Sequence, residues 1–454
     1  MAACVKSPSR GEFPRALGVL DSTALVVGTI VGSGIFLTTG LIARHLPSSG
    51  WILAVWLLGG VLSAMGALTF AQLGALRPEA GGAYVYTREA FGPLPAFLYG
   101  WTLFWILQCG SIAAIASGFS HYFGKFFPSF SMERVLVTLA FDGWTWHLAA
   151  GQLSAAAAVA VLTLLNICGL RAGSFLQNAL AALKLSALAV FAAAGVAFSD
   201  VAAPAAMPPS QPASASAVGV ALVAVLWAYA GWFNLNFAAE EIKNPRRTIP
   251  AALGAGLALV TALYLAVNWV YVRAVPMEVI RGVVPVAERV AVHLWGDFAA
   301  SLVAAAVVVS TLGALNGLIL MSPRAFFAMA RDGFFFKMRA RLHPRFRTPH
   351  TFLAVQGAWS CVLVLAGGYE ALFTYVMFAG FLFTALACAS LFVLRKRAAG
   401  ARLPFRWTYP WVPAGYILVC VVLALNTLRE RPLESLGGFA LLALGAVWYR
   451  IGGK

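Results

Sequence analysis

Charged residues are scarce in this sequence, and acidic residues are the scarcest of them. Only 11% of the 454 residues are charged, 61% are hydrophobic, and several long runs contain no charge at all. A water-soluble domain of this size does not have such a composition. The composition therefore excludes a soluble protein and indicates a polytopic membrane protein.

Twelve apolar runs have the length of a transmembrane helix, which needs about 20 residues to cross a hydrocarbon core of about 30 Å. We therefore expect an all-α protein with twelve such helices, of which the last is the shortest. The runs are residues 22–43, 51–76, 93–120, 148–170, 172–198, 217–239, 248–272, 298–323, 351–369, 371–394, 407–428 and 435–449.

Basic residues are distributed unevenly between the two sets of loops. With the termini placed inside, 23 of the 32 Lys and Arg residues fall on the termini and inner loops, 8 on outer loops and one within a span. This bias predicts cytoplasmic termini in the cell (inner or plasma) membrane. The net charge of +16 then faces anionic lipid headgroups, so we expect lipids as partners and no nucleic acid.

Patterns of cysteine and histidine that would build a disulfide framework or a metal site are also missing. The six cysteines lie in the N-terminal tail or within spans, and none lies in a long outer loop. The six histidines fall at span ends or in loops, without metal-ligand spacing. We therefore expect no disulfide framework, no metal, no cofactor and no enzymatic activity.

The first apolar run, "VVGTIVGSGIF", is weakened at its centre by Gly28, Gly32 and Gly34, each of which costs about 1 kcal/mol relative to alanine in a helix. Gly28 and Gly32 form a small-xxx-small pair, which is typical of close helix packing. That interpretation leaves Thr29, Ser33 and Gly34 unexplained. The alternative is an unwound segment whose amides, carbonyls and half-helix dipoles bind a small zwitterion.

A second interrupted run opens the second half of the chain. The segment "LWAYAGWFNLNFAAEEIKNPRRTIP" is interrupted by Ala230, Gly231, Asn234 and Asn236. Interruptions at corresponding positions of two halves are the best sequence indication of a transporter binding site. They favour the binding interpretation, with spans 1 to 5 and 6 to 10 as the halves.

Four motifs in order resemble the amino acid, polyamine and organocation transporter superfamily, specifically its L-type amino acid transporter branch. They are "GTIVGSGIF", "PEAGGAYVYTREAFG", "AYAGW" followed by "NFAAEEIKNPRRTIP", and "STLGALNGLILMSPRAFFAMARDG". The resemblance implies two inverted five-helix repeats plus two extra helices, as in the sodium-coupled leucine transporter, with helices 1 and 6 broken. The expected parts are a cytoplasmic tail (1–16), the two repeats (17–198 and 199–394) and a last part with helices 11 and 12 (395–454).

The resemblance also implies which residues bind substrate. The α-carboxylate is expected at backbone amides and the hydroxyl around Ser33 and Gly34, and the α-ammonium at carbonyls near the ends of the half-helices. Partial charges at half-helix ends satisfy a zwitterion without ionised side chains. The expected binding residues are Ile30, Val31, Gly32, Ser33, Gly34, Trp227, Ala228 and Ala230.

Two of these residues carry further expectations. Trp227 resembles the aromatic gate of the family, although a Trp in a span is often simply packed or interfacial. Ala230 occupies a position at which relatives that take cationic amino acids can carry an acid. With a methyl group there, a cationic side chain would lack a counter-charge, so neutral substrates are favoured.

Lys184 is the one basic residue inside a span, in "LAALKLSALAVF". An intramembrane ionisable residue is a functional candidate by default, the alternative being a lysine that reaches an interface or a carbonyl for structural reasons. In sodium-independent relatives, a lysine here resembles a built-in cation between helices 1, 5 and 8. Ser310 is then expected beside it, as a neighbour and not as a sodium ligand.

Acidic and basic residues cluster at the inner end of the sixth span. Such a cluster is usually a solvated face that contributes little to stability. We expect either Glu240 or Glu241 to close the inner side by pairing with the loop that bears Arg88, or with Arg324 or Arg331. The sequence does not choose the pair.

The expected function is sodium-independent transport of neutral amino acids by alternating access, with exchange favoured on the branch resemblance. Proton-coupled uptake and a non-transporting amino acid sensor remain open alternatives. Eukaryotic relatives of this branch are disulfide-linked to a heavy subunit through a cysteine between spans 3 and 4, and this loop has none. We therefore expect no such subunit, and a monomer or weak oligomer.

Overall fold

The structure is a computed structural model, and it describes residues 13–141, 144–197, 212–282, 285–335, 338–367, 369–398, 400, 403–430 and 432–452. Within these residues, ten helices are long and apolar enough to cross a membrane, and two further apolar helices, His350–Ala366 and Ser435–Ile451, are shorter. The predicted all-α polytopic fold is confirmed. The count of twelve spans stays a prediction.

The long helices follow the predicted apolar runs closely, and the strands and several of the short helices lie in the connections between the runs. Their bounds are α1 (Val19–Ile30), α2 (Gly34–Ile42), α3 (Ser49–Leu76), α4 (Ala83–Phe91), α5 (Pro93–Thr102), the π-helix η1 (Leu103–Gln108), α6 (Cys109–Phe126), the 3₁₀ turn η2 (Pro128–Phe130), β1 (Val135–Phe141), β2 (Trp144–Ala149), α7 (Ala150–Ile167), α8 (Leu170–Ala197), α9 (Ala215–Tyr229), the 3₁₀ helix η3 (Trp232–Glu241), α10 (Pro245–Ala274), α11 (Met277–Ile280), α12 (Val286–Trp295), α13 (Asp297–Met321), α14 (Pro323–Arg331), α15 (His350–Ala366), α16 (Tyr369–Arg397), the 3₁₀ turn η4 (Arg406–Thr408), α17 (Trp411–Glu430) and α18 (Pro432–Gly452).

Each spanning helix buries one stripe of side chains against its neighbours and presents an apolar stripe of side chains to the outside of the bundle. On α8 the buried residues include Gln177, Ala181 and Lys184, which recur at helical spacing, while Phe175 and Leu183 are exposed. In a soluble protein the exposed stripe would be polar. Here the exposed stripe is apolar and the polar side chains Gln177 and Lys184 lie on the buried one, as expected of a helix that faces protein on one side and lipid on the other.

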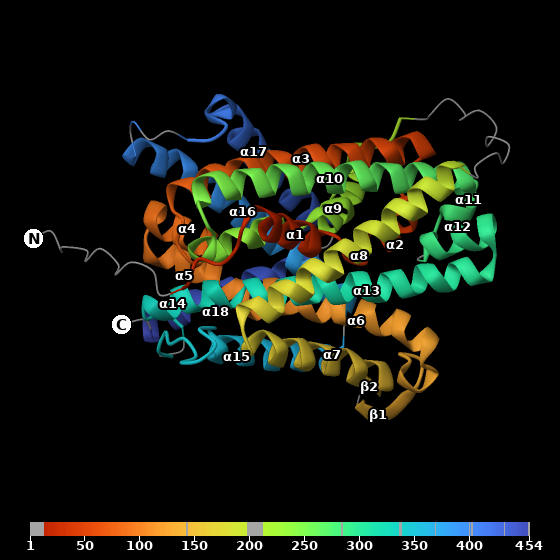
Figure 1. The fold of residues 1–454 in the computed structure, drawn as a ribbon, viewed down its shortest axis with the longest axis horizontal. Helices are drawn as coiled ribbons and strands as arrows, with labels where there is room; N and C mark the ends of the chain where they lie inside the picture. Colours follow the sequence, from red (N-terminus) through yellow and green to blue (C-terminus); the bar gives the residue numbers. More distant parts are fainter. Residues whose placement is uncertain are drawn as a thin grey trace, which may run out of the picture.

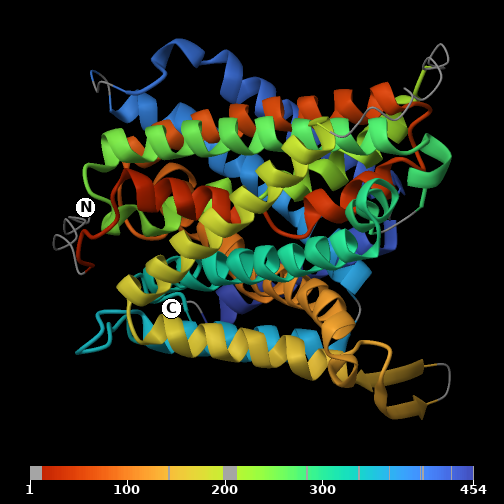
Figure 2. The same ribbon diagram turned by 45° about the vertical axis from the view of Figure 1, so that its right-hand side comes forward.

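The long helices lie in layers along the longest axis of the molecule. α3 and α10 form one edge, α7 and α15 the opposite edge, and α1 lies between them (Figures 1 and 2). α3 contacts α10, α6 contacts α13, and α7 contacts α15. Spans 2, 3 and 4 therefore pack against spans 7, 8 and 9, which places the two broken spans in the middle.

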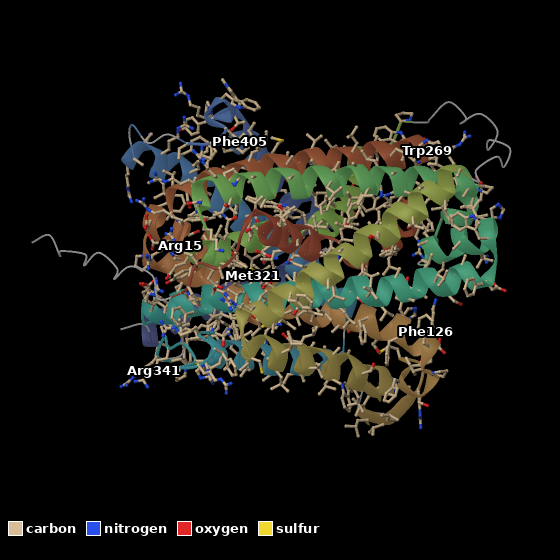
Figure 3. All side chains as sticks on the ribbon, in the orientation of Figure 1. Arg15, Phe126, Trp269, Met321, Arg341 and Phe405 are labelled. Carbon is tan, nitrogen blue, oxygen red and sulfur yellow. The ribbon has the colours of Figure 1, made fainter. Side chains whose placement is uncertain are left out.

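The two ends of the long axis differ. Arg15 and Arg341 lie at one end, called here the N-terminal end, and Phe126 and Trp269 lie at the other (Figure 3). The second end carries an antiparallel hairpin of β1 and β2, with a register irregularity between Val135 and Val137. The hairpin was not predicted, although its β-branched and aromatic residues favour strands. Trp146 donates a hydrogen bond to the carbonyl of Leu365 (3.1 Å), which attaches the hairpin to the end of α15.

Candidate functional site

Both predicted breaks in helices 1 and 6 are confirmed. α1 ends at Ile30, Val31 is extended (φ −76°, ψ 94°), and α2 begins only at Gly34. α9 ends at Tyr229, Ala230 is extended (φ −64°, ψ 152°), and the 3₁₀ helix η3 follows. Each break leaves backbone amides and carbonyls at mid-span without intrahelical partners.

The two breaks touch each other. The Thr29 hydroxyl lies 3.1 Å from the carbonyl oxygen of Gly231 and also bonds to carbonyls in its own helix. Gly231 has φ +121°, and a Cβ there would lie 2.7 Å from the carbonyl oxygen of Thr29. Both the backbone angle and the close approach therefore require glycine at this point.

Tyr264 of α10 joins the breaks from the side. Its hydroxyl lies 3.3 Å from the carbonyl oxygen of Ile30 and 3.1 Å from that of Ala228. It therefore holds the C-terminal ends of α1 and α9 together. No pattern in the sequence indicates a role for this residue, because a Tyr in an apolar run is usual in any span.

The three glycines of the first break serve different purposes. A Cβ at Gly28 would lie 1.8 Å from Gln177 Nε2, and a Cβ at Gly34 would lie 2.7 Å from the Cβ of Ala228. These two glycines permit close packing. A Cβ at Gly32 would meet only Ala314, at an ordinary 3.5 Å. Helix packing thus explains Gly28 and Gly34, whereas Gly32 belongs to the unwound segment.

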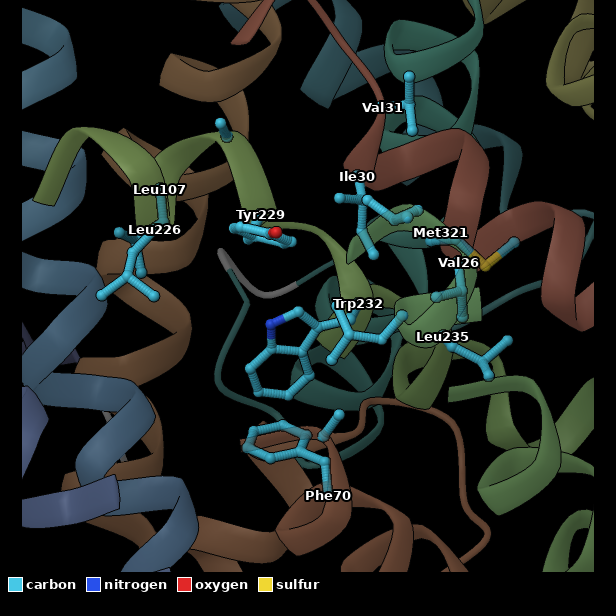
Figure 4. Packing of buried hydrophobic residues seen from close by; sticks show 14 of the residues in the cluster. Val26, Ile30, Val31, Phe70, Leu107, Leu226, Tyr229, Trp232, Leu235 and Met321 are labelled. Atoms are coloured by element: carbon cyan, nitrogen blue, oxygen red, sulfur yellow. The ribbon is translucent and has the colours of Figure 1, made fainter. Parts of the chain in front are cut away.

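A cavity of about 130 Å³ lies between the breaks. Figure 4 shows Trp232 and Phe70 close together beside Ile30 and Tyr229 at this point, and the rings of Trp232 and Phe70 meet edge to face at 5.1 Å. Of the predicted binding residues, seven line the cavity: Ile30, Gly32, Ser33, Gly34, Trp227, Ala228 and Ala230. Val31 is fully buried and does not line it.

The described cavity lining contains no Asp, Glu, Lys, Arg or His. Its polar groups are backbone amides and carbonyls, hydroxyls, the indoles of Trp227 and Trp232, and the side-chain amides of Gln108 and Asn234. The start of α2 offers N–H groups with a partial positive charge, and the ends of α1 and α9 offer carbonyls with a partial negative charge. This arrangement suits a ligand that carries one charge of each sign and no net charge.

Lys184 lies behind the first break, 1% exposed. Its ammonium donates to the carbonyls of Gly28 (2.9 Å), Val31 (2.6 Å) and Ser310 (3.0 Å). An ammonium has three donors, so these three acceptors satisfy it completely. The Ser310 hydroxyl lies 3.1 Å from the carbonyl oxygens of Val31 and Gly32. Lys184 and Ser310 thus join spans 1, 5 and 8 without lining the cavity.

Ion pairs join neighbouring elements at the N-terminal end. Arg324 donates from Nε and Nη2 to the two carboxylate oxygens of Glu241, at 2.7 and 3.2 Å, and both side chains are 1% exposed. Glu240 lies 3.6 Å from Arg331 and accepts from the amides of Phe13 and Ala80. The two glutamates therefore have separate partners, and neither of them lines the cavity.

Arg88 pairs with Asp332, a partner that the sequence did not suggest. Burial is the largest influence on the pKa of Arg88 and lowers it, but Asp332, Tyr84 and Glu79 together raise the pKa overall. Glu79 lies in the same group of charges. Burial raises the pKa of Glu79, and the nearby Glu89 raises it further against the effect of the arginines.

The fold and the site together define a class of protein: a multi-pass membrane transporter with two broken helices around a central pocket. The chain matches the family model described as "Amino acid permease" over residues 17–434, so it belongs to the amino acid permease family. It is an amino acid transporter and not an enzyme, and the resemblance to the superfamily is confirmed.

Several named transporters are similar to this chain over most of its length. The mouse (Mus musculus) b(0,+)-type amino acid transporter 1 is 31% identical over 447 residues, 96% of this chain and 88% of the relative. The serine/threonine exchanger SteT of Bacillus subtilis (strain 168) is 30% identical over 403 residues, 88% of each chain. The human (Homo sapiens) cystine/glutamate transporter is 28% identical over 447 residues, 96% of this chain and 85% of the relative.

Proposed function

We propose that this protein exchanges neutral amino acids across the cell membrane without sodium. The observation that carries the proposal is the cavity between the two breaks, whose described lining has no charged side chain. A cationic or anionic substrate side chain would enter this cavity without a counter-charge, at a large desolvation cost. A neutral amino acid brings only its ammonium and carboxylate, for which the half-helix ends provide partners.

The environment of Lys184 supports sodium independence. Sodium in coupled relatives is expected between spans 1, 5 and 8, and here the ammonium of Lys184 bonds to carbonyls of spans 1 and 8. The fixed ammonium of Lys184 holds spans 1, 5 and 8 together, as bound sodium would in the coupled relatives, and it needs no ion gradient to do so. Exchange is preferred to net uptake on the similarity to exchangers, of which SteT is named one.

We further infer the orientation and assembly. The N-terminal end faces the cytoplasm because the inner loops carry most of the basic residues. Two inverted repeats, 17–198 and 199–394, account for the packing of spans 2, 3 and 4 against spans 7, 8 and 9. Trp227, which lines the cavity beside the second break, acts as the gate over bound substrate. The protein works alone, as a monomer or weak oligomer, because the loop between spans 3 and 4 lacks a cysteine.

The test uses purified protein in proteoliposomes. Uptake of labelled alanine is measured with and without internal alanine, with external sodium replaced by choline, and with a pH gradient imposed on empty and loaded vesicles. The proposal expects uptake only into loaded vesicles, equal in sodium and choline. Strict sodium dependence, or uptake into empty vesicles driven by the pH gradient, would contradict it.

A further inference from the structure

Two amide side chains face each other on the wall of the same cavity. Gln108 and Asn234 both line it, and both are more than nine-tenths buried. Gln108 Nε2 donates to Asn234 Oδ1 over 2.8 Å, although the residues are 126 positions apart in the chain. The other two atoms, Gln108 Oε1 and Asn234 Nδ2, have no hydrogen-bond partner among the described residues.

An unpartnered buried donor or acceptor costs about 1–3 kcal/mol, and the large majority of buried polar atoms in native proteins are paired. Here one pair leaves one acceptor and one donor together on a cavity wall. Amide oxygen and nitrogen positions are assigned from their partners, so both side chains can be turned over. The turned pair still leaves one donor and one acceptor, so the chemistry that it offers is unchanged.

Irregular backbone places both amides. Gln108 is the last residue of the π-helix η1, and π-helices are rare segments that are frequent at functional sites. Asn234 lies in the first turn of η3, and its backbone N–H donates to the carbonyl of Gly231 in the second break (3.0 Å). The chain therefore departs from a regular α-helix on both sides of the pair.

We propose that Gln108 and Asn234 form the side-chain subsite of the cavity and select amino acids whose side chain ends in a primary carboxamide. The carboxamide oxygen accepts from Asn234, and the carboxamide nitrogen donates to Gln108. A carboxylate has no donor, an ammonium has no acceptor, and an alkyl side chain leaves both protein amides unpaired. Sites that hydrogen-bond a polar substrate group reject analogues that lack it, for this last reason. The inference rests on the proposed function and names its substrate class.

Matched amino acids test the subsite in proteoliposomes. The inhibition constants of asparagine and leucine, which have similar shapes, are measured against exchange of labelled alanine. Asparagine is expected to bind at least about 10-fold more tightly than leucine, corresponding to one or two neutral hydrogen bonds. In the double variant Gln108→Leu/Asn234→Leu, both amides are replaced by apolar groups, and this preference is expected to disappear or reverse.

Asn178→Leu is the matched control, because Asn178 donates to Asp21 outside the cavity. The ratio of the inhibition constants of asparagine and leucine for this variant is expected to equal that of the wild type. If the protein exchanges alanine but binds asparagine no more tightly than leucine, the subsite is overturned and the proposed function is not. The same holds if the protein binds threonine more tightly than valine but shows no preference for asparagine. Absence of any amino acid exchange overturns the proposed function instead. The wild-type ratio decides the subsite even where the double variant does not reach the membrane.

Discussion

Each donor of the Lys184 ammonium has a carbonyl acceptor, and two of the three acceptors belong to the first broken span. The side chain approaches so closely that a Cβ at Gly313 would lie 2.8 Å from its Cε and Nζ. At the scale of single residues, this contact leaves the Lys184 side chain little room to move. Loss of the ammonium leaves three carbonyls without this donor.

Lys184→Met keeps the length of the side chain but removes the charge and the donors. Alanine exchange is expected to fall at least tenfold, since the position of the first break relative to spans 5 and 8 loses its support, and added sodium should not restore it. Lys125→Met is the control, because Lys125 is an exposed lysine that pairs with Glu288 away from the cavity. Full exchange by Lys184→Met would show that the ammonium is dispensable.

Gly34→Leu should abolish substrate binding. The new side chain would meet both the Cβ and the backbone Cα of Ala228, at 2.7 and 2.9 Å from its Cβ, so the two breaks would have to separate. Binding of alanine is measured by displacement of the labelled amino acid from purified protein. Gly254→Leu, where nothing lies within 4 Å of the Cβ, should bind normally. Wild-type affinity in Gly34→Leu would remove the first break from the binding site.

Ala230→Asp should change charge selectivity. Ala230 lines the cavity, and a carboxylate there would provide a charge-assisted partner for a cationic side chain. The affinity for arginine relative to that for leucine, measured from their inhibition constants, is expected to rise at least tenfold. Ala230→Asn has the same size without the charge and should leave the ratio low. A wild-type protein that already takes arginine as well as leucine would refute this account of the cavity.

The sequence predicted those residues that are unusual for their surroundings. Lys184 stood out as a charge inside an apolar run, and Gly28, Gly32 and Gly34 as breakers in a helix. Gln108 and Tyr264 did not, because a single amide or phenol in a span is compatible with ordinary packing. Which way such a side chain points depends on the rotation of its helix, and the rotation is set by neighbours distant in sequence.

At the scale of elements, the buried pair of Arg324 and Glu241 fixes the start of α14 against the end of η3. Arg324→Met would leave a carboxylate buried without its partner, at a cost of about 3–5 kcal/mol. The melting temperature in detergent is expected to fall clearly. The double variant Arg324→Met/Glu241→Leu should regain most of the loss, since no unpaired charge remains. A double variant as unstable as the single one would show that the arginine acts by packing alone.

Glu79, between α3 and α4, gives a pH dependence with a definite sign. Burial raises its pKa above the ordinary 4.5, so the folded protein holds this proton more tightly than the unfolded chain does. The resulting stabilisation is full below pH 4.5 and is lost as the pH rises through the folded pKa. Glu79→Gln should therefore raise the melting temperature more at pH 8 than at pH 5. An equal effect at both pH values would contradict this.

The breaks of spans 1 and 6 were predictable because glycine and polar residues disturb a helix locally. The π-helix η1 was not, because "LFWILQ" contains no breaker and the extra residue per turn is imposed by packing. The hairpin of β1 and β2 was also missed. Its strands lie in the connection between the predicted spans 3 and 4, where alternating aromatic and β-branched residues favour pairing.

At the scale of the whole molecule, the layers place each of spans 2, 3 and 4 against its counterpart in the second half. The apolar runs themselves predicted the helices well. They did not predict which helices touch, because lipid and protein interior are both apolar, so an apolar lipid-facing stripe resembles an apolar buried one. Only the broken spans, with their polar backbone, indicated their own place in the centre.

The charge-free cavity has an electrical consequence. Moving one elementary charge across the membrane changes its free energy by about 2.3 kcal/mol for each 100 mV of membrane potential. An exchange cycle that carries one zwitterion inward and another outward through this cavity moves no net charge, and the ammonium of Lys184 stays within the protein. Under the proposed exchange of neutral amino acids, the voltage therefore does no work on the cycle, and the concentrations of amino acids on the two sides set the direction of exchange.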